Sequence, residues 1–134
     1  MQSIVECVPN FSNGRDPAVY GRIVDAIRSV ASVQVLDVSA DPDHNRTVVT
    51  FVGGPDDVVE AGYRGIAAAK DLIDLDHHQG EHPRIGATDV FPFIPVRGVT
   101  MDECVMLARR LGKRIGEELG VAVYLYGAAA TTPD

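Results

Sequence analysis

Apolar residues recur along the chain with two different spacings, and the alternation between them predicts alternating strands and helices. Stretches that are rich in β-branched residues, or in which every second residue is apolar, predict strands at 3–8, 33–40, 46–53, 90–96 and 121–126. Apolar residues three and four positions apart predict helices that begin at Pro17, Pro55 and Met101. A polar, turn-forming connection joins 33–40 to 46–53, so these two strands are expected to form a hairpin.

Local capping signals mark the ends of the predicted helices. Asp16 stands before a proline and has the position of an N-cap, while Thr100 followed by Glu103 has the pattern of a capping box. The second helix is expected to run to about residue 75, and its Gly62 and Gly65 would weaken it locally. Such small residues allow a helix to pack closely on a sheet.

The strand at 90–96 contains Pro92 and Pro95, which cannot donate backbone hydrogen bonds. It is therefore expected at an edge or a bulged position and not at the centre of a sheet. The element order predicts an α/β two-layer sandwich, the ferredoxin-like split βαβ arrangement extended by one helix and one strand. Its helices would cover one sheet face only. The other face then requires polar residues, a second sheet or another chain.

Size and charge exclude several classes of protein. The 134 residues correspond to a single domain, 1–134. A net charge of −7 argues against nucleic acid as a partner, because binding phosphates requires a basic face. No apolar run is long enough for a membrane span, and the first residues lack the features of a signal peptide, so a cytoplasmic location is expected. Cys7 and Cys104 lie far apart among apolar neighbours and are expected to be buried free thiols.

The densest group of titratable residues lies at 76–89, between two apolar segments, and contains three of the four histidines. His82 stands between Glu81 and Pro83, with Arg84 following, and is the best candidate for a general acid or base near neutral pH. His77 and His78 follow the predicted helix, where a positive imidazole favours the C-terminal dipole, so a structural or surface role is expected for them.

Two further histidine hypotheses stay open. His78, Glu81 and His82 fit the H-x-x-E-H pattern of a zinc hydrolase, but Gly80 interrupts a helix there and no histidine follows as a third ligand. We therefore expect no metal. His44, in the hairpin turn, belongs either to the same pocket as His82 or to an exposed loop.

Five runs of residues carry a resemblance that covers nearly the whole chain. They are 5–12 (VECVPNFS), 45–47 (NRT), 80–87 (GEHPRIGA), 92–99 (PFIPVRGV) and 123–127 (VYLYG). Together they resemble the N-terminal subdomain of glutamate formimidoyltransferase. The resemblance implies transfer of a formimino group between N-formimino-L-glutamate and tetrahydrofolate as co-substrate, with His82 as the catalytic histidine. It also implies a second subdomain that supplies part of the folate site. Ala128 departs from the family pattern, which has an acidic residue after 126–127.

These observations suggest roles for the neighbouring residues. A formimino group is usually cationic, so the carboxylates of Glu81 or Asp89 would stabilise it, while Arg84 and Arg46 would hold substrate carboxylates. His44 is a further tentative contact. The alternative to an enzyme is a folate-binding or interaction module that has the same fold but catalyses no reaction. In either case we expect the 134 residues alone to be a poor catalyst and to associate with a second subdomain or with another copy.

Overall fold

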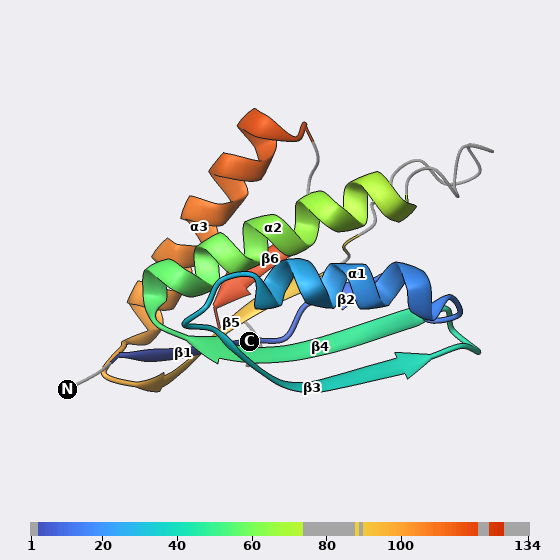
Figure 1. Ribbon diagram of the computed structural model, residues 1–134. Helices are drawn as coiled ribbons and strands as arrows, with labels where there is room; N and C mark the ends of the chain where they lie inside the picture. Colours follow the sequence, from blue (N-terminus) through green and yellow to red (C-terminus); the bar gives the residue numbers. More distant parts are fainter. Residues whose placement is uncertain (1–2, 74–87, 89, 121–123, 128–134) are drawn as a thin grey trace.

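Helices α1 (Pro17–Arg28), α2 (Pro55–Ile73) and α3 (Met101–Glu118) lie on one side of a sheet, with α2 in the middle (Figure 1). This arrangement is seen in a computed structural model that describes residues 3–73, 88, 90–120 and 124–127. The two layers confirm the predicted α/β sandwich. In the described part of the chain, no helix is both long and apolar enough to cross a membrane.

The sheet has the strand order expected for a ferredoxin-like fold with one added strand. Its strands are β1 (Ile4–Cys7), β2 (Asn10–Phe11), β3 (Gln34–Asp41), β4 (Arg46–Gly53), β5 (Val90–Arg97) and β6 (Tyr124–Gly127). They are arranged as β3-β4-β1-β5-β6, and β2 continues β1 along β4. Strands β5 and β6 are parallel, while the other neighbours are antiparallel. The split βαβ arrangement and the β3–β4 hairpin are thus confirmed.

The edge position expected for the proline-containing strand is wrong, because β5 lies between β1 and β6. Pro92 lies one residue beyond the last pair with β1, which is Cys7 with Phe93. Pro95 lies outside the four residues that pair with β6, and the ladder with β1 is shifted by a bulge beside it. Both prolines therefore stand where the ladder is incomplete or irregular, and a central strand accommodates them. The bulged position was the correct alternative.

The helix boundaries follow the local signals. The Asp16 side chain accepts a hydrogen bond from the Ala18 amide at 3.0 Å, which confirms the N-cap of α1. At α3, Thr100 Oγ1 accepts from the Glu103 amide at 3.1 Å, and the Glu103 carboxylate accepts from the Thr100 amide at 2.8 Å. The predicted capping box is therefore present in full.

A continuous apolar core fills the space between the layers, and small residues on α2 bring the helices close to it. An added Cβ at Gly62 would lie 2.7 Å from Cζ of Phe91 and 3.0 Å from Cδ2 of Leu111. At Gly65 it would lie 2.8 Å from Cγ1 of Ile27. Gly62 thus allows contact with the sheet, as expected, whereas Gly65 allows contact with α1. The largest fully buried side chains include Phe11, Phe51, Phe91, Phe93, Ile23, Ile27, Ile66, Ile73, Leu111 and Ile115.

The sheet face turned away from the helices, here called the open face, is not covered by any described helix. Along β4 the buried residues Thr47, Val49 and Phe51 point to the helices and alternate with half-buried Val48 and Thr50. The open face is therefore of mixed polarity. Leu36 in β3 and Val96 in β5 are also 55% and 54% exposed.

Candidate functional site

The described residues on either side of the histidine-rich segment lie at one end of the sheet, the end that carries the β3–β4 turn, here called the hairpin end (Figure 1). Most of this segment lies outside the described residues, and the structure therefore does not place His77, His78, Glu81, His82, Arg84 or Asp89. It does place the two flanks. Ile73 ends α2 toward the hairpin end, and Thr88 forms an isolated bridge with Phe11, which also pairs with Thr47. The segment therefore leaves and rejoins the fold at this end.

Arg46, one of the predicted substrate contacts, lies at the same end and on the open face. It is the first residue of β4 and is exposed, and the next residue, Thr47, is fully buried under the helices. Because side chains alternate along a strand, Arg46 shares the open face with Val48 and with Asn10, which pairs with Val48. The structure thus brings a guanidinium and an amide side chain to the end at which the histidine segment is attached.

Asn10 was not among the residues singled out from the sequence. The first predicted strand ends at residue 8, whereas the structure has a further short strand at Asn10–Phe11. Only the pairing of this strand with β4 shows which face Asn10 occupies. The one sequence signal that could have found it is the alternation of Asn10 with the apolar Phe11.

His44 is held within the β3–β4 turn. Its Nδ1 atom lies 2.7 Å from Oδ2 of Asp41, while Oδ1 of Asp41 accepts hydrogen bonds from the amides of Asp43 and His44 at 3.0 and 3.3 Å. The side-chain hydrogen bond with His44 is the main cause that lowers the pKa of Asp41. The His44 side chain is 71% exposed, so these contacts favour the exposed-loop reading of this residue.

The turn that contains His44 packs against the loop between β2 and α1. The Asn45 side chain accepts a hydrogen bond from the Gly14 amide at 3.0 Å, and Thr47 Oγ1 donates to the Asn13 carbonyl at 2.6 Å. Nε of Arg15 donates to the Pro42 carbonyl at 2.7 Å. Two segments about thirty residues apart therefore form one hydrogen-bonded unit at the hairpin end.

Thr88 is the one residue of the histidine-rich segment that the structure describes. Thr88 is only 3% exposed, and its Oγ1 has no hydrogen-bond partner among the residues that the structure describes. Residues 87 and 89, its neighbours in the chain, lie outside that part. Thr88 thus marks the point at which the segment rejoins the buried part of the sheet.

The residues that the structure describes contain no group of three or more His, Cys, Asp or Glu side chains that could hold a metal ion. The three residues of the zinc hypothesis, His78, Glu81 and His82, are outside this part. The expectation that the protein uses no metal therefore stays a prediction.

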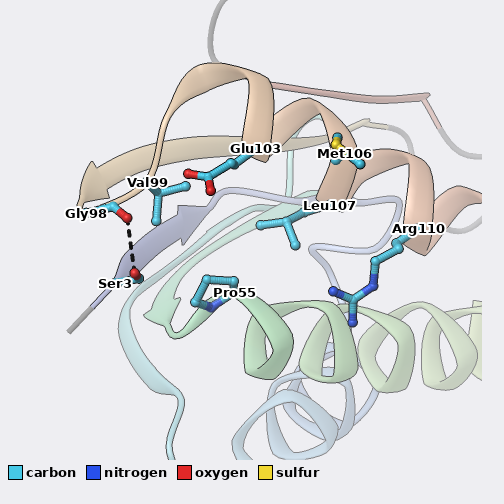
Figure 2. A pocket seen from close by; sticks show the side chains of 8 residues that line it. All are labelled: Ser3, Pro55, Gly98, Val99, Glu103, Met106, Leu107 and Arg110. Carbon is cyan, nitrogen blue, oxygen red and sulfur yellow. Dashed lines mark hydrogen bonds between the residues drawn. The ribbon is translucent and has the colours of Figure 1, made fainter. Parts of the chain in front are cut away.

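A groove of about 230 Å³ lies at the opposite end of the sheet (Figure 2). Figure 2 shows Met106, Leu107 and Arg110 of α3 above Pro55 at the start of α2, with the Ser3 hydroxyl donating to the Gly98 carbonyl at 3.1 Å. Arg110 is also paired with Asp56 at 2.8 Å. None of these residues was a candidate from the sequence, and the groove lies far along β4 from Arg46.

Comparison with known proteins agrees with the sequence analysis. The profile of the formiminotransferase domain, N-terminal subdomain, matches residues 4–134. The chain is 58% identical over 132 residues to the glutamate formimidoyltransferase of Thermoplasma acidophilum, covering 98% of this chain and 44% of that protein. It is 57% identical to the formimidoyltransferase-cyclodeaminase of Sus scrofa, with 98% and 24% covered.

The glutamate formimidoyltransferase of Streptococcus pyogenes serotype M1 is 44% identical, with 100% of this chain and 45% of that protein covered. The chain thus spans less than half the length of these curated relatives. Among solved structures, MupZ from Pseudomonas fluorescens matches at a TM-score of 0.46 and 7% identity, covering 99% of this chain and 95% of that one. This last likeness is too weak to support any argument.

Proposed function

The chain belongs to the formiminotransferase domain family, in which it corresponds to the N-terminal subdomain, and from this premise we propose that it is the catalytic-histidine subdomain of a glutamate formimidoyltransferase. The observation that carries this proposal is the identity of 58% with a protein named glutamate formimidoyltransferase over nearly all of the chain. The proposed reaction moves a formimino group between N-formimino-L-glutamate and tetrahydrofolate. Tetrahydrofolate acts as the co-substrate, and the proposed mechanism uses no metal.

The chemistry of this reaction requires a group that both removes and returns a proton. An amine nitrogen of tetrahydrofolate attacks the formimino carbon and forms a new C–N bond, and this nitrogen must lose a proton. The bond from the carbon to the glutamate nitrogen then breaks, and the departing amine gains a proton. A single imidazole near neutral pH can do both, and we assign this role to His82.

Charged side chains around the reacting group have complementary roles in this proposal. The cationic formimino group would be stabilised by the carboxylate of Glu81 or Asp89, and the substrate carboxylates would be held by Arg84 and Arg46. The position of Arg46 supports its role. It is exposed on the open face at the hairpin end, where the segment that contains His82 is attached.

The proposed partner of the open face is a second subdomain of the same enzyme or another copy of the chain. Exposed Leu36 and Val96, together with half-buried Val48 and Val52, give this side of the sheet an apolar component that suits an interface. The curated relatives are more than twice as long as this chain, which leaves room in them for such a subdomain. We propose that the folate site is completed across this face.

An assay that follows both reaction products tests the proposal on the natural polypeptide that contains these residues. Purified protein is mixed with N-formimino-L-glutamate and tetrahydrofolate, and both the formimino-folate product and free glutamate are measured. Formation of both in equal amounts is expected. Folate binding without product would instead support the non-catalytic module, and activity that is lost on chelation and restored by zinc would support the hydrolase alternative.

A further inference from the structure

Asn45, which precedes Arg46, has an unusual backbone. Its φ is 53°, and it is the one non-glycine residue with positive φ in the part of the chain that the structure describes. Asparagine tolerates this left-handed conformation better than most residues, because its short side chain can form local hydrogen bonds. The Asn45 amide also donates to the Pro42 carbonyl at 3.3 Å and closes the β3–β4 turn. The direction in which the chain enters β4 is therefore set at Asn45.

The Asn45 side chain ties this turn to the loop before α1. Its Oδ1 accepts a hydrogen bond from the Gly14 amide at 3.0 Å. The approach between the two segments is so close that only glycine fits at position 14. An added Cβ there would lie 2.6 Å from the backbone nitrogen of Arg46 and 2.7 Å from the Asp41 carbonyl oxygen, and neither atom belongs to a movable side chain.

The same loop contacts the turn on both sides of Arg46. Before it, Nε of Arg15 donates to the Pro42 carbonyl at 2.7 Å. After it, Thr47 Oγ1 donates to the Asn13 carbonyl at 2.6 Å, and Thr47 is fully buried. The backbone of Arg46 is thus fixed by hydrogen bonds of residues on each side, whereas its side chain is exposed.

We infer that Asn45 is a positioning residue, which acts through Arg46 to hold the guanidinium on the open face for a substrate carboxylate. This inference rests on the function proposed above. A bidentate bond between guanidinium and carboxylate depends on direction as well as distance, and ordering a flexible side chain lowers affinity. With its backbone fixed, Arg46 loses less freedom when it binds the carboxylate. Asn45 itself need not touch the substrate.

Two substitutions separate the hydrogen bond from the backbone conformation. Asn45→Gly keeps access to positive φ but removes the acceptor for the Gly14 amide, whereas Asn45→Asp keeps both. In the natural polypeptide, Asn45→Gly is expected to raise KM for N-formimino-L-glutamate by about fivefold to twentyfold, the worth of one or two hydrogen bonds, with kcat within about twofold of wild type. Asn45→Asp should have a KM closer to wild type.

A stability control and a double substitution test whether the effect passes through Arg46. Thr100→Ala removes the cap of α3 and lowers stability at the opposite end of the sheet, so its KM should stay unchanged. In an Arg46→Ala background, Asn45→Gly should raise KM no further. Additive effects of the two substitutions would overturn the inference, as would equal increases in KM for Asn45→Gly and Thr100→Ala.

Amide hydrogen exchange provides a measurement that does not depend on activity. In Asn45→Gly the amides of Gly14 and Arg46 should exchange at least about tenfold faster than in wild type, and in Thr100→Ala they should not. If the wild-type protein transfers no formimino group, the proposed function fails, and exchange then decides whether Asn45 positions Arg46. Unchanged exchange at Arg46 in Asn45→Gly overturns the inference in either case.

Discussion

The guanidinium group of Arg114 lies over the ring of Tyr63, with its Cζ atom 3.7 Å from the ring centroid. Arg114 also donates to Oε1 of Glu60 at 2.7 Å, so that α3 is held to α2 by a cation–π contact and an ion pair at once. Oε2 of Glu60 accepts from Arg64 at 2.8 Å, and Arg64 in turn donates to Ser29 Oγ at the end of α1. One line of contacts thus joins all three described helices.

Arg114→Met should therefore destabilise the fold more than an equivalent change in a simple surface pair. We expect a loss of about 1–2 kcal/mol in the free energy of unfolding, from the cation–π contact and the ion pair together. Arg110→Met is the matched control, because Asp56 is the one ion-pair partner of Arg110 among the residues that the structure describes, and these two side chains are 54% and 85% exposed. Its loss should stay below about 0.5 kcal/mol. Urea unfolding measures both, and similar losses would contradict the role given to Tyr63 and Glu60.

Acid should weaken the same contacts through Glu60. Hydrogen bonds from Arg114 and then Arg64 lower the pKa of Glu60 below its ordinary value of 4.5. A carboxylate with a lowered pKa in the folded state stabilises the fold above its unfolded pKa, and this contribution is lost as the pH falls through the folded pKa. The stability difference between wild type and Glu60→Gln should therefore shrink as the pH falls below about 4.5. A difference that is constant down to strongly acidic pH would show that the two arginines do not stabilise the ionised form.

Substituting alanine for two helical glycines should change the stability of the fold in opposite directions. At Gly62 the new Cβ meets the ring of Phe91 at 2.7 Å, so Gly62→Ala should destabilise the fold by about 1–3 kcal/mol through overpacking. At Gly116 an added Cβ would have no atom of another described element within 4 Å, so Gly116→Ala should stabilise the fold by up to about 1 kcal/mol through helix propensity. Thermal unfolding distinguishes the two. A gain in stability at Gly62 would mean that α2 packs less closely on the sheet.

His82 carries the central prediction about catalysis. In the natural polypeptide, His82→Ala should lower kcat by roughly 10²–10⁴-fold, the usual contribution of one positioned acid or base. His77→Ala is the control in the same segment and should lower kcat far less. Initial rates of formimino transfer measure both. Activity of His82→Ala within twofold of wild type would remove the residue from this role, and equal losses at both positions would indicate structural damage or a metal site.

The two thiols should be unreactive in the folded protein. Cys7 and Cys104 are free and buried, and desolvation raises the pKa of both, that of Cys7 strongly. Because the thiolate is the nucleophile, neither should react with a thiol reagent until the protein unfolds. Absorbance on labelling, with and without denaturant, tests this. Rapid reaction of Cys7 in the native protein would be inconsistent with β1 at the centre of the sheet.

Features that depend on nearby residues could be predicted from the sequence. The caps at Asp16 and Thr100 use side chains two or three residues from the groups they bind, and both are where the sequence placed them. The layer arrangement followed in the same way from the order of the elements. The central position of β5 could not be predicted, because the effect of Pro92 and Pro95 depends on where β1 and β6 end.

In the candidate site, too, the residue types could be found from the sequence, whereas their positions depend on contacts between distant residues. The sequence indicated Arg46 as a candidate for holding a substrate carboxylate. Its place on the open face, however, follows only from the burial of Thr47 under distant helices. Asn10 was missed because its face is fixed by pairing with Val48, nearly forty residues away in the chain. The roles of His82, Glu81, Arg84 and Asp89 rest on the sequence and the family, and they remain predictions.

The position of β1 has a consequence for biosynthesis. This strand precedes the other described strands of the sheet in the chain, yet both of its neighbours, β4 and β5, are made much later. Ribosomal synthesis therefore produces α1, the hairpin and α2 while one edge of β1 still has no partner. The sheet can close around β1 only after Arg97 has left the ribosome, because contacts between distant residues must wait for the later one. Until then, the unpaired edge of β1 is where a nascent chain would bind a chaperone or a neighbouring strand.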